Sequence, residues 1–338
     1  MGNLLFSYSR PSNNVSRDYA PGSEERALLK EAVEKTCSQF TEVPLIIDGK
    51  EVRTGNVGDI VMPHCHGHKL GIYHKAGEGE VKLAIESSMR AHRQWAETPC
   101  TDRAAIMMRI AELIDKKYRY VLNAATMMGQ SKNAWQAEIE AASETIDYFR
   151  FGAHFMSNIY RDQPSSESGA INYMEYRALE GFVYAVTPFN FTAIAANLPM
   201  APVLMGNTVL WKPATTSLLS SYCLMKIFME AGLPAGVLNF IPGSGAVSSK
   251  CALASKDLAG IHFTGSTQVF NSLWKGVAAN LENYKSYPRV VGETGGKDFI
   301  FMHSSADAEE VSAAIVRGAF EYQGQKCSAA SRGYIPRS

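Results

Sequence analysis

A single cysteine near the end of this 338-residue chain stands in a setting that suits a reactive thiol. In the segment "EYQGQKCSAASR", Cys327 follows Lys326 and precedes Ser328, Ala329 and Ala330. A nearby cation favours the thiolate, and small neighbours leave room for a substrate. The pattern indicates a nucleophile at Cys327. An inert, buried cysteine is the alternative.

Two polar residues elsewhere in the chain could assist such a nucleophile. Asn190 stands in "TPFNFT", just past an apolar segment and between Phe189 and Phe191, where a sheltered amide could donate to an oxyanion. Glu293 in "RVVGETGGKD" follows two valines, so we expect a buried carboxyl that could act as a general base. The alternatives are a turn asparagine that bonds its own backbone and an exposed loop acid.

Three segments could bind an anionic ligand such as a phosphate. "HFTGSTQ" places Gly265 and Ser266 where a strand turns into a helix, whose free N–H groups suit a phosphate. Lys212, at the end of "VLWK", could hold a ribose hydroxyl or a phosphate. "PGSG" contains Gly243 but lacks the third glycine of a dinucleotide fingerprint. The alternatives are a helix cap at Ser266 and a solvated loop lysine at Lys212.

A cluster of histidines raises the question of a metal. "MPHCHGHK" contains His64, Cys65, His66 and His68, and imidazole and thiolate are the usual zinc ligands. Adjacent residues cannot all point at one ion, and no second cluster is visible in the sequence. We therefore expect no metal site.

The composition favours small-molecule chemistry. The 33 basic residues balance the 33 acidic ones, which gives no electrostatic reason to expect nucleic acid or an anionic membrane as partner. Six cysteines are scattered without a C-x-x-C pair, as in proteins of reducing compartments. No apolar run approaches the roughly 18 residues that span a bilayer.

The order of elements must position these residues. A hairpin is predicted over 44–55 with its turn at Asp48-Gly49, and apolar residues at helical spacing predict three helical segments. From residue 171 strand-like and helix-like segments alternate, which predicts an α/β fold with a parallel sheet and helices on both faces. Ligands of such sheets bind beyond the carboxyl ends of the strands. The predicted helices span 79–97, 101–117 and 133–160, and the predicted strands 171–179, 181–188, 207–214, 236–243 and 258–266.

Taken in order, these motifs resemble the aldehyde dehydrogenase superfamily. The resemblance rests on "PFNF", "WKP", "FTGST", "GETGGK" and "GQKCS" and extends from about Pro44 to the last residue. "QAEIEAASETIDYFRF", "FEYQGQKCSAASR" and "SLWKGVAANL" are similar to the mitochondrial glutamate-semialdehyde (1-pyrroline-5-carboxylate) dehydrogenases of proline catabolism. The resemblance implies an α/β fold with a Rossmann-type cofactor domain, followed by a catalytic domain.

The resemblance implies NAD-dependent oxidation of L-glutamate γ-semialdehyde to L-glutamate. The Cys327 thiolate would attack the aldehyde carbon, while the Asn190 amide and the Cys327 backbone N–H hold the oxyanion. A thiohemiacetal and then a thioester would form on the thiol. Glu293 would activate the water that hydrolyses the thioester.

The resemblance also assigns residues that contact ligands. Lys212 and Ser266 would contact the adenosine ribose and the pyrophosphate of NAD. Ser328 would contact the substrate carboxylate. Further cofactor contacts are implied for Pro188, Gly243 and Gly265, and Phe191 and Glu138 would line the substrate pocket.

Two departures from the family pattern modify these expectations. After "WKP" the family usually has serine and an acid, whereas this chain has Ala214 and Thr215. Without a carboxylate to accept the ribose hydroxyls, we expect weaker NAD binding and some tolerance of NADP. Family members also continue well beyond the cysteine motif, so we expect a chain cut short, with doubtful activity of its own.

The resemblance implies a division of the chain and a cellular setting. We expect an N-terminal arm (1–43), a cofactor-binding domain (44–160 and 181–297), part of an oligomerisation flap (161–180) and the beginning of a catalytic domain (298–338). A homo-oligomer in the mitochondrial matrix is implied, although the first 17 residues only faintly resemble a transit peptide. The alternatives are a non-catalytic dinucleotide-binding isoform and a dehydrogenase of another aldehyde.

Overall fold

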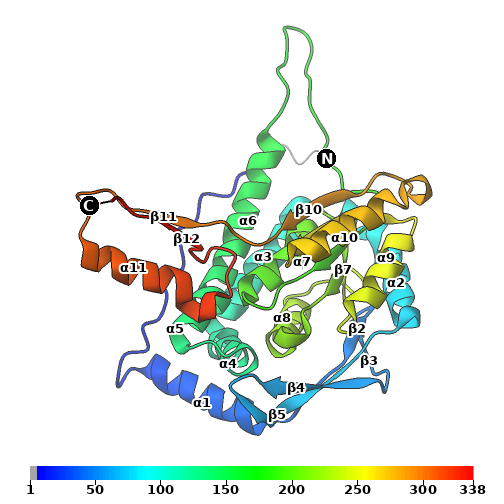
Figure 1. Ribbon diagram of the computed structural model, residues 1–338. Helices are drawn as coiled ribbons and strands as arrows, with labels where there is room; N and C mark the ends of the chain where they lie inside the picture. The colour runs from blue at the N-terminus through cyan, green and yellow to red at the C-terminus, as the bar shows by residue number, and fades with distance from the viewer. Residues whose placement is uncertain (1–5, 338) are drawn as a thin grey trace.

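A seven-stranded sheet forms the centre of the molecule in the computed structural model, which describes residues 6–337 (Figure 1). The strand order is β10-β9-β6-β7-β8-β2-β3. The first five strands run parallel, and β2 and β3 extend the sheet in antiparallel fashion. The strands are β2 (Leu45–Ile47), β3 (Lys50–Val52), β6 (Phe182–Val186), β7 (Thr208–Lys212), β8 (Leu238–Phe240), β9 (Leu258–Thr264) and β10 (Arg289–Glu293).

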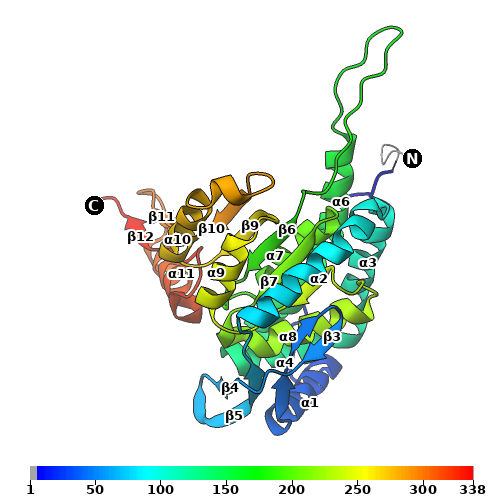
Figure 2. The same cartoon turned by 90° about the vertical axis from the view of Figure 1, so that its right-hand side faces the viewer.

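Helices cover both faces of this sheet (Figure 2). On one face lie α2 (Glu78–Glu97), α9 (Gly245–Ala254) and α10 (Thr267–Ala278). On the other face lie α7 and α8, backed by further helices. The helices on this second face, including α7 and α8, are α3 (Cys100–Leu113), η1 (Ile114–Tyr118), α4 (Arg119–Gln130), α5 (Ala134–Ala137), η2 (Glu138–Ser143), α6 (Glu144–Arg161), α7 (Thr192–Leu204), η3 (Thr215–Ser217) and α8 (Leu218–Glu230).

Strand β6 shows why both faces must be covered. Its side chains alternate between two cores, because successive residues of a strand point to opposite faces. Phe182 and Tyr184 belong to the core under α2 and α9, whereas Val183 and Ala185 belong to the core under α7 and α8. The predicted α/β fold class, with its parallel sheet and two helical layers, is confirmed.

The predicted hairpin is also confirmed. Asp48 and Gly49 join β2 to β3 with φ angles of 55° and 71°, which is the left-handed geometry of a tight hairpin turn. A separate three-stranded sheet in the order β1-β5-β4 packs near α1. These elements are α1 (Glu24–Ser38), β1 (Thr41–Val43), β4 (Val57–Met62) and β5 (Cys65–His74).

One predicted strand is wrong. Residues 171–179 form no strand, and residues 162–180 leave the body of the protein as a long loop with one isolated bridge between Glu167 and Ala170 (Figure 1). No strand within residues 6–337 pairs with this segment, and Ile171 is 86% exposed. A strand needs a hydrogen-bonding neighbour, and alternation of residue types cannot supply one.

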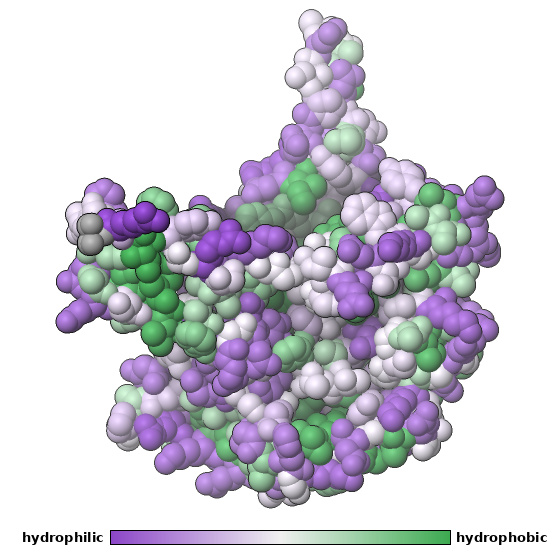
Figure 3. Space-filling view, viewed as in Figure 1, coloured by the Kyte–Doolittle hydropathy of each residue, from purple (hydrophilic) through white to green (hydrophobic). Residues whose placement is uncertain are grey.

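The last part of the chain packs loosely against the body. It comprises β11 (Phe299–Phe301), α11 (Ala308–Phe320), η5 (Glu321–Gly324) and β12 (Arg332–Tyr334), and β11 pairs with β12 in parallel. Tyr322 is its single buried residue between positions 298 and 337. Hydrophobic side chains lie on its surface (Figure 3), and Phe301 is 72% exposed.

Two further findings concern residues 6–337 alone. No helix there has both the length and the hydrophobicity needed to cross a membrane. Nor does that part of the chain bring three potential metal ligands together. In the histidine cluster, His64 Nδ1 lies 2.8 Å from Ser131 Oγ and His68 Nε2 lies 2.9 Å from the Cys37 carbonyl oxygen, so these two side chains diverge.

Candidate active site

A cavity of about 820 Å³ opens at the carboxyl ends of the parallel strands, where the sequence places its motifs. The loops after β6, β7, β9 and β10 form its walls, together with the first turns of α9 and α10 and the segment that ends at Cys327. Six of the predicted site residues line it: Pro188, Asn190, Lys212, Gly265, Ser266 and Cys327. The topology thus brings together residues that are up to 139 positions apart in sequence (327 minus 188).

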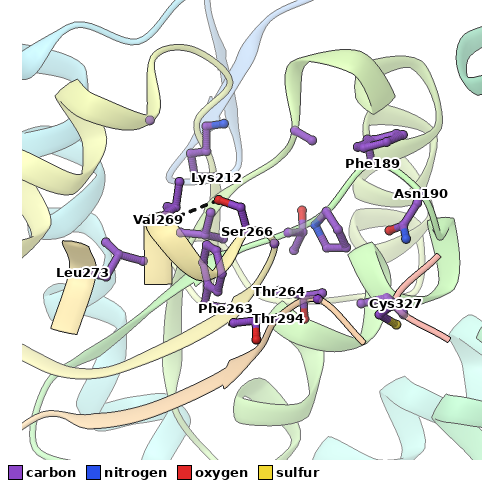
Figure 4. A pocket seen from close by; sticks show the side chains of 18 of the residues that line it. Phe189, Asn190, Lys212, Phe263, Thr264, Ser266, Val269, Leu273, Thr294 and Cys327 are labelled. Atoms are coloured by element: carbon purple, nitrogen blue, oxygen red, sulfur yellow. Dashed lines mark hydrogen bonds between the residues drawn. The ribbon is translucent and has the colours of Figure 1, made fainter. Parts of the chain in front are cut away.

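Cys327 and Asn190 lie together on one side of the cavity (Figure 4). Asn190 Nδ2 donates a hydrogen bond to the Gln325 carbonyl oxygen at 3.0 Å, which fixes the plane of the amide beside the cysteine segment. Its second N–H remains available to a ligand. Gly296 makes room for this segment, because a Cβ there would lie 1.4 Å from the Cys327 carbonyl oxygen. The arrangement places an amide donor next to a thiol.

Lys212 and Ser266 lie on the other side of the cavity (Figure 4). Burial lowers the pKa of Lys212, and its ammonium has no carboxylate partner among the described residues. Lys212 is partly buried. A partly desolvated cation without a partner is costly, so its position in a cavity wall fits a polar or anionic ligand. Ser266 caps α10, because its hydroxyl accepts a hydrogen bond from Val269 N at 3.3 Å. The cap interpretation of Ser266 is therefore correct, although Ser266 also lines the cavity.

The cavity wall contains no acidic residue within residues 6–337. Lys212 and Lys326 are its two charged residues. A dinucleotide carries two phosphates and would meet no fixed negative charge there. The residues present fit such a cofactor, with Lys212 and the first turns of α9 and α10 as the groups that would hold it.

The prediction that Glu293 is buried is wrong. Its side chain is exposed at the end of β10, and Thr294 and Gly295 occupy the cavity wall instead. The two valines before it suggested burial, but β10 is the edge strand of the sheet. Even Val291 is 56% exposed, because no described element covers that side of the strand.

Glu138 does not line the cavity and is fully buried elsewhere. Its carboxylate accepts hydrogen bonds from Tyr19 Oη at 2.6 Å, Asn123 Nδ2 at 2.8 Å and the Arg119 guanidinium. The backbone N–H of Arg17 donates a further bond at 2.9 Å. Glu138 therefore anchors the N-terminal arm to α4, and its predicted contact with substrate is wrong because both oxygens are already bound.

Three other predicted ligand contacts also lie outside the cavity wall. Gly243 pairs with Ala76, and a Cβ at Gly243 would lie 2.9 Å from the Ala76 backbone nitrogen. That glycine is needed for packing. Ser328 is exposed, and the ring of Phe191 faces the ammonium groups of Lys132 and Lys326.

Glu144 is a residue that the sequence motifs did not single out. Burial, and then the nearby Glu140, raise the pKa of Glu144 to about 7, and its Oε2 has no hydrogen-bond partner among residues 6–337. Burial also raises the pKa of Tyr148 to about 12, with contributions from Glu144 and Cys327. Glu140, Glu144 and Tyr148 recur every four residues, the spacing of one helix face. That spacing was the available signal, and it places ionisable groups behind the cysteine.

Comparisons with known proteins agree with this geometry. Residues 52–338 match the model of the aldehyde dehydrogenase family. The chain is 49% identical over 331 residues to the mitochondrial delta-1-pyrroline-5-carboxylate dehydrogenase of Dictyostelium discoideum, covering 97% of this chain and 59% of that protein. The human mitochondrial protein of the same name is 44% identical over 320 residues, covering 95% of this chain and 57% of the relative.

A solved structure shows the same relation. The delta-pyrroline-5-carboxylate dehydrogenase of Mycobacterium tuberculosis bound with NAD has 47% sequence identity and a TM-score of 0.95, with 98% of this chain and 62% of that chain covered. The chain thus spans about 60% of the length of the relatives it matches. Its strand-end motifs, its fold and its match over residues 52–338 agree: the chain belongs to the aldehyde dehydrogenase family.

Proposed function

We propose that this chain supplies the cofactor cavity and the nucleophile of an NAD-dependent dehydrogenase that oxidises L-glutamate γ-semialdehyde (1-pyrroline-5-carboxylate) to L-glutamate in proline catabolism. One observation carries the proposal. A single cavity joins a thiol, an amide donor and a partly buried lysine without a carboxylate partner among the described residues, at the carboxyl ends of the parallel strands. The names of the relatives described above support the choice of substrate.

Bound NAD would supply the hydride acceptor in this reaction. Lys212 would hold its ribose or phosphate oxygens, which would give the partly buried ammonium a partner that residues 6–337 do not supply. The first turns of α9 and α10 present backbone N–H groups on the same side of the cavity. Gly265 and Pro188 complete the wall there.

Cys327 would form the covalent bond to substrate. Its thiolate attacks the aldehyde carbon and gives a thiohemiacetal, and oxidation of that adduct gives a thioester. The amide of Asn190, held by the Gln325 carbonyl, would donate its free N–H to the developing oxyanion. Glu293, which precedes the cavity residue Thr294, would activate the hydrolytic water after turning inward from its exposed position.

NADH formation by the purified chain tests the proposal. The activity of the chain on its own is doubtful, so NAD binding is measured beside NADH formation from L-glutamate γ-semialdehyde and NAD. Any NADH formation should be abolished by Cys327→Ser, which should leave NAD binding intact. Cys65→Ser is the matched control, because Cys65 is exposed on β5 and outside the cavity. Turnover that survives Cys327→Ser would contradict the assignment of the nucleophile.

A second candidate is a chain that binds dinucleotide without turnover. The observation in its favour is the contrast within the site: Lys212 is sheltered, whereas Glu293 and Ser328 are exposed. Saturable NAD binding without NADH formation would support this candidate against the first. Turnover of a different aldehyde would instead correct the substrate.

We also propose that the site tolerates NADP. Ala214 lines the cavity where the family usually has a serine followed by an acid, and no carboxylate is present in the wall to repel a 2′-phosphate. Comparable turnover or affinity with the two cofactors would support this. A strong preference for NAD would overturn it.

The cellular setting and the assembly are proposals as well. Several relatives are named mitochondrial proteins, and we propose the mitochondrial matrix for this one. We propose that residues 161–180, which protrude from the cofactor-binding domain (44–160 and 181–297), contact a second subunit of a homo-oligomer. Light scattering on the chain with and without residues 164–176 tests the proposed homo-oligomer. The chain with the intact loop should have the mass of an oligomer, and the chain without it should have the mass of a monomer.

A further inference from the structure

The segment that carries Cys327 contains a strained turn. Tyr322 and Gln323 have φ angles of 51° and 54°, and Gly324 follows with a φ of 69°. Two consecutive residues with side chains in the left-handed region cost energy and persist only when surrounding contacts hold them. A Cβ at Gly324 would lie 2.9 Å from the Ala319 carbonyl oxygen, so the turn is also closely packed. Contacts with the rest of the protein must therefore hold this segment in place.

Tyr322 supplies the first anchor. It is 5% exposed, and its hydroxyl donates a hydrogen bond to the Gln130 carbonyl oxygen at 2.5 Å. The Lys132 ammonium lies 4.0 Å from the centre of the Tyr322 ring, which is cation–π geometry. The turn thus contacts the loop that joins α4 to α5.

Glu140 supplies the second anchor and is the centre of the cluster. Its Oε1 pairs with Lys326 Nζ at 2.5 Å, and its Oε2 pairs with Lys132 Nζ. Glu140 comes from η2, Lys132 from the loop after α4, and Lys326 stands directly before Cys327. Each oxygen of one carboxylate therefore binds a different segment. The Lys132 side chain is fully buried, so little solvent screens its pair.

The same cluster reaches the proposed oxyanion donor. Phe191 follows Asn190, and its ring centre lies 4.7 Å from Lys132 Nζ and 5.6 Å from Lys326 Nζ. Asn190 in turn donates to the Gln325 carbonyl. Lys326 is the chain neighbour of Cys327, and Phe191, whose ring faces both lysines, is the chain neighbour of Asn190. The two lysines that Glu140 binds therefore contact the segments that carry the thiol and the amide.

We propose that Glu140 is a positioning residue: by binding Lys132 and Lys326 together, it holds the Cys327 segment against Asn190 and neutralises the charge of Lys326 beside the thiol. This rests on the proposed function only in taking Cys327 as the nucleophile. The other charged groups that face Glu140 are Glu321, 3.2 Å from Lys326 Nζ, and Glu144. Without Glu140, the charges of the buried Lys132 and the partly buried Lys326 would be balanced only in part by those two acids.

Alkylation of Cys327 by iodoacetamide, followed on its own peptide by mass spectrometry from pH 6 to 10, tests this. Neither NAD nor aldehyde is needed, so a failure of the proposed function leaves the result interpretable. In Glu140→Gln the unpaired ammonium should favour the thiolate, and we expect the midpoint to fall by about half a pH unit or more. The control Glu282→Gln removes an exposed acid outside this cluster and should leave the midpoint unchanged.

A double variant separates positioning from a general loss of structure. If Glu140 acts through Lys326, Glu140→Gln should shift the midpoint much less in a Lys326→Met background. The proposal would be overturned if Glu140→Gln shifted the midpoint of Cys327 alkylation equally in the wild-type and the Lys326→Met backgrounds. It would also be overturned if the midpoint shifted in neither background. If Glu140→Gln does not fold, hydrogen exchange of Lys326→Met decides, because this variant keeps the buried pair of Glu140 with Lys132.

We expect amides 321–330 of Lys326→Met to exchange at least about tenfold faster than in the wild type, while β6 and β7 stay protected. Unchanged exchange in 321–330 would show that the ion pair does not hold the segment, which would contradict the proposal.

Discussion

The two sides of the cavity are built in different ways. The cofactor side extends from the central sheet, where Trp211 is fully buried one residue before Lys212. The side that carries Cys327, the proposed nucleophile, is formed by the loop with Asn190 and by residues from 298–337, where Tyr322 is the one buried residue. Rigidity of the first side comes from the two cores of the sheet, and that of the second from a few polar contacts. Mutations should therefore affect global stability on one side and local geometry on the other.

The largest expected effect is on the free energy of unfolding, and it should differ between a substitution in the central sheet and one in residues 298–337. Trp211→Ala would empty a fully buried site and leave Thr187 Oγ1 without the indole N–H that it accepts at 3.0 Å. We expect a loss of about 3–5 kcal/mol in the free energy of unfolding. Phe320→Ala on α11, where the ring is 69% exposed, should cost under about 0.5 kcal/mol. Urea denaturation measures the free energy of unfolding of both variants. Similar losses in the two variants would contradict the difference proposed between the two sides of the cavity.

A pH effect on stability is expected near Cys327, the proposed nucleophile. The pKa of Glu144 is raised to about 7 in the folded protein, above its value of 4.5, so the folded state binds more protons between these values. Stability should fall as the pH rises from about 4.5 through 7. Glu144→Gln should therefore stabilise more at pH 8 than at pH 5, by at most about 3 kcal/mol. The exposed Glu282→Gln serves as control, and a pH-independent effect would contradict the assignment.

A smaller effect is expected at the cofactor side. Burial lowers the pKa of Lys212, so its charged form costs stability at every pH below that lowered value. Lys212→Met should raise the free energy of unfolding at pH 7 by about 1 kcal/mol in the absence of ligand. Lys275→Met on the exposed side of α10 should change it little. A destabilised Lys212→Met would indicate that the lysine is satisfied in the free protein.

An effect of similar size, but confined to one segment, is expected at the strained turn. Tyr322→Phe removes one buried hydrogen bond, to the Gln130 carbonyl, and keeps the ring against Lys132. We expect a cost of about 1 kcal/mol, confined to residues 321–330 in hydrogen exchange. Protection lost equally across β6 and β7 would mean that the two sides are not independent.

Local patterns predicted well the parts of the cavity wall that follow the parallel strands. The alternation of strands and helices determines where strands end, and parallel strands bring their ends to one edge. Asn190, Lys212 and Ser266 therefore met in one cavity as expected. The hairpin at Asp48-Gly49 was equally accessible, because its turn needs residues that accept positive φ.

What failed depends on neighbours that local sequence does not specify. Two valines before Glu293 suggested a buried strand, but burial depends on what covers β10, and an edge strand has one side open. Glu138 was assigned to the pocket, whereas its partners Tyr19 and Asn123 lie 119 and 15 positions away. Glu140 binds Lys132 and also Lys326, which lies 186 positions away from Glu140, and no helical or strand period reveals such a contact.

Calorimetric titration of NAD into the purified chain tests the central claim most directly. We predict saturable binding at one site, at least about tenfold weaker in Lys212→Met, which corresponds to about 1.4 kcal/mol, and unchanged in Lys275→Met. Absence of saturable binding, or equal affinity in Lys212→Met and the wild type, would contradict the assignment of this cavity to the cofactor.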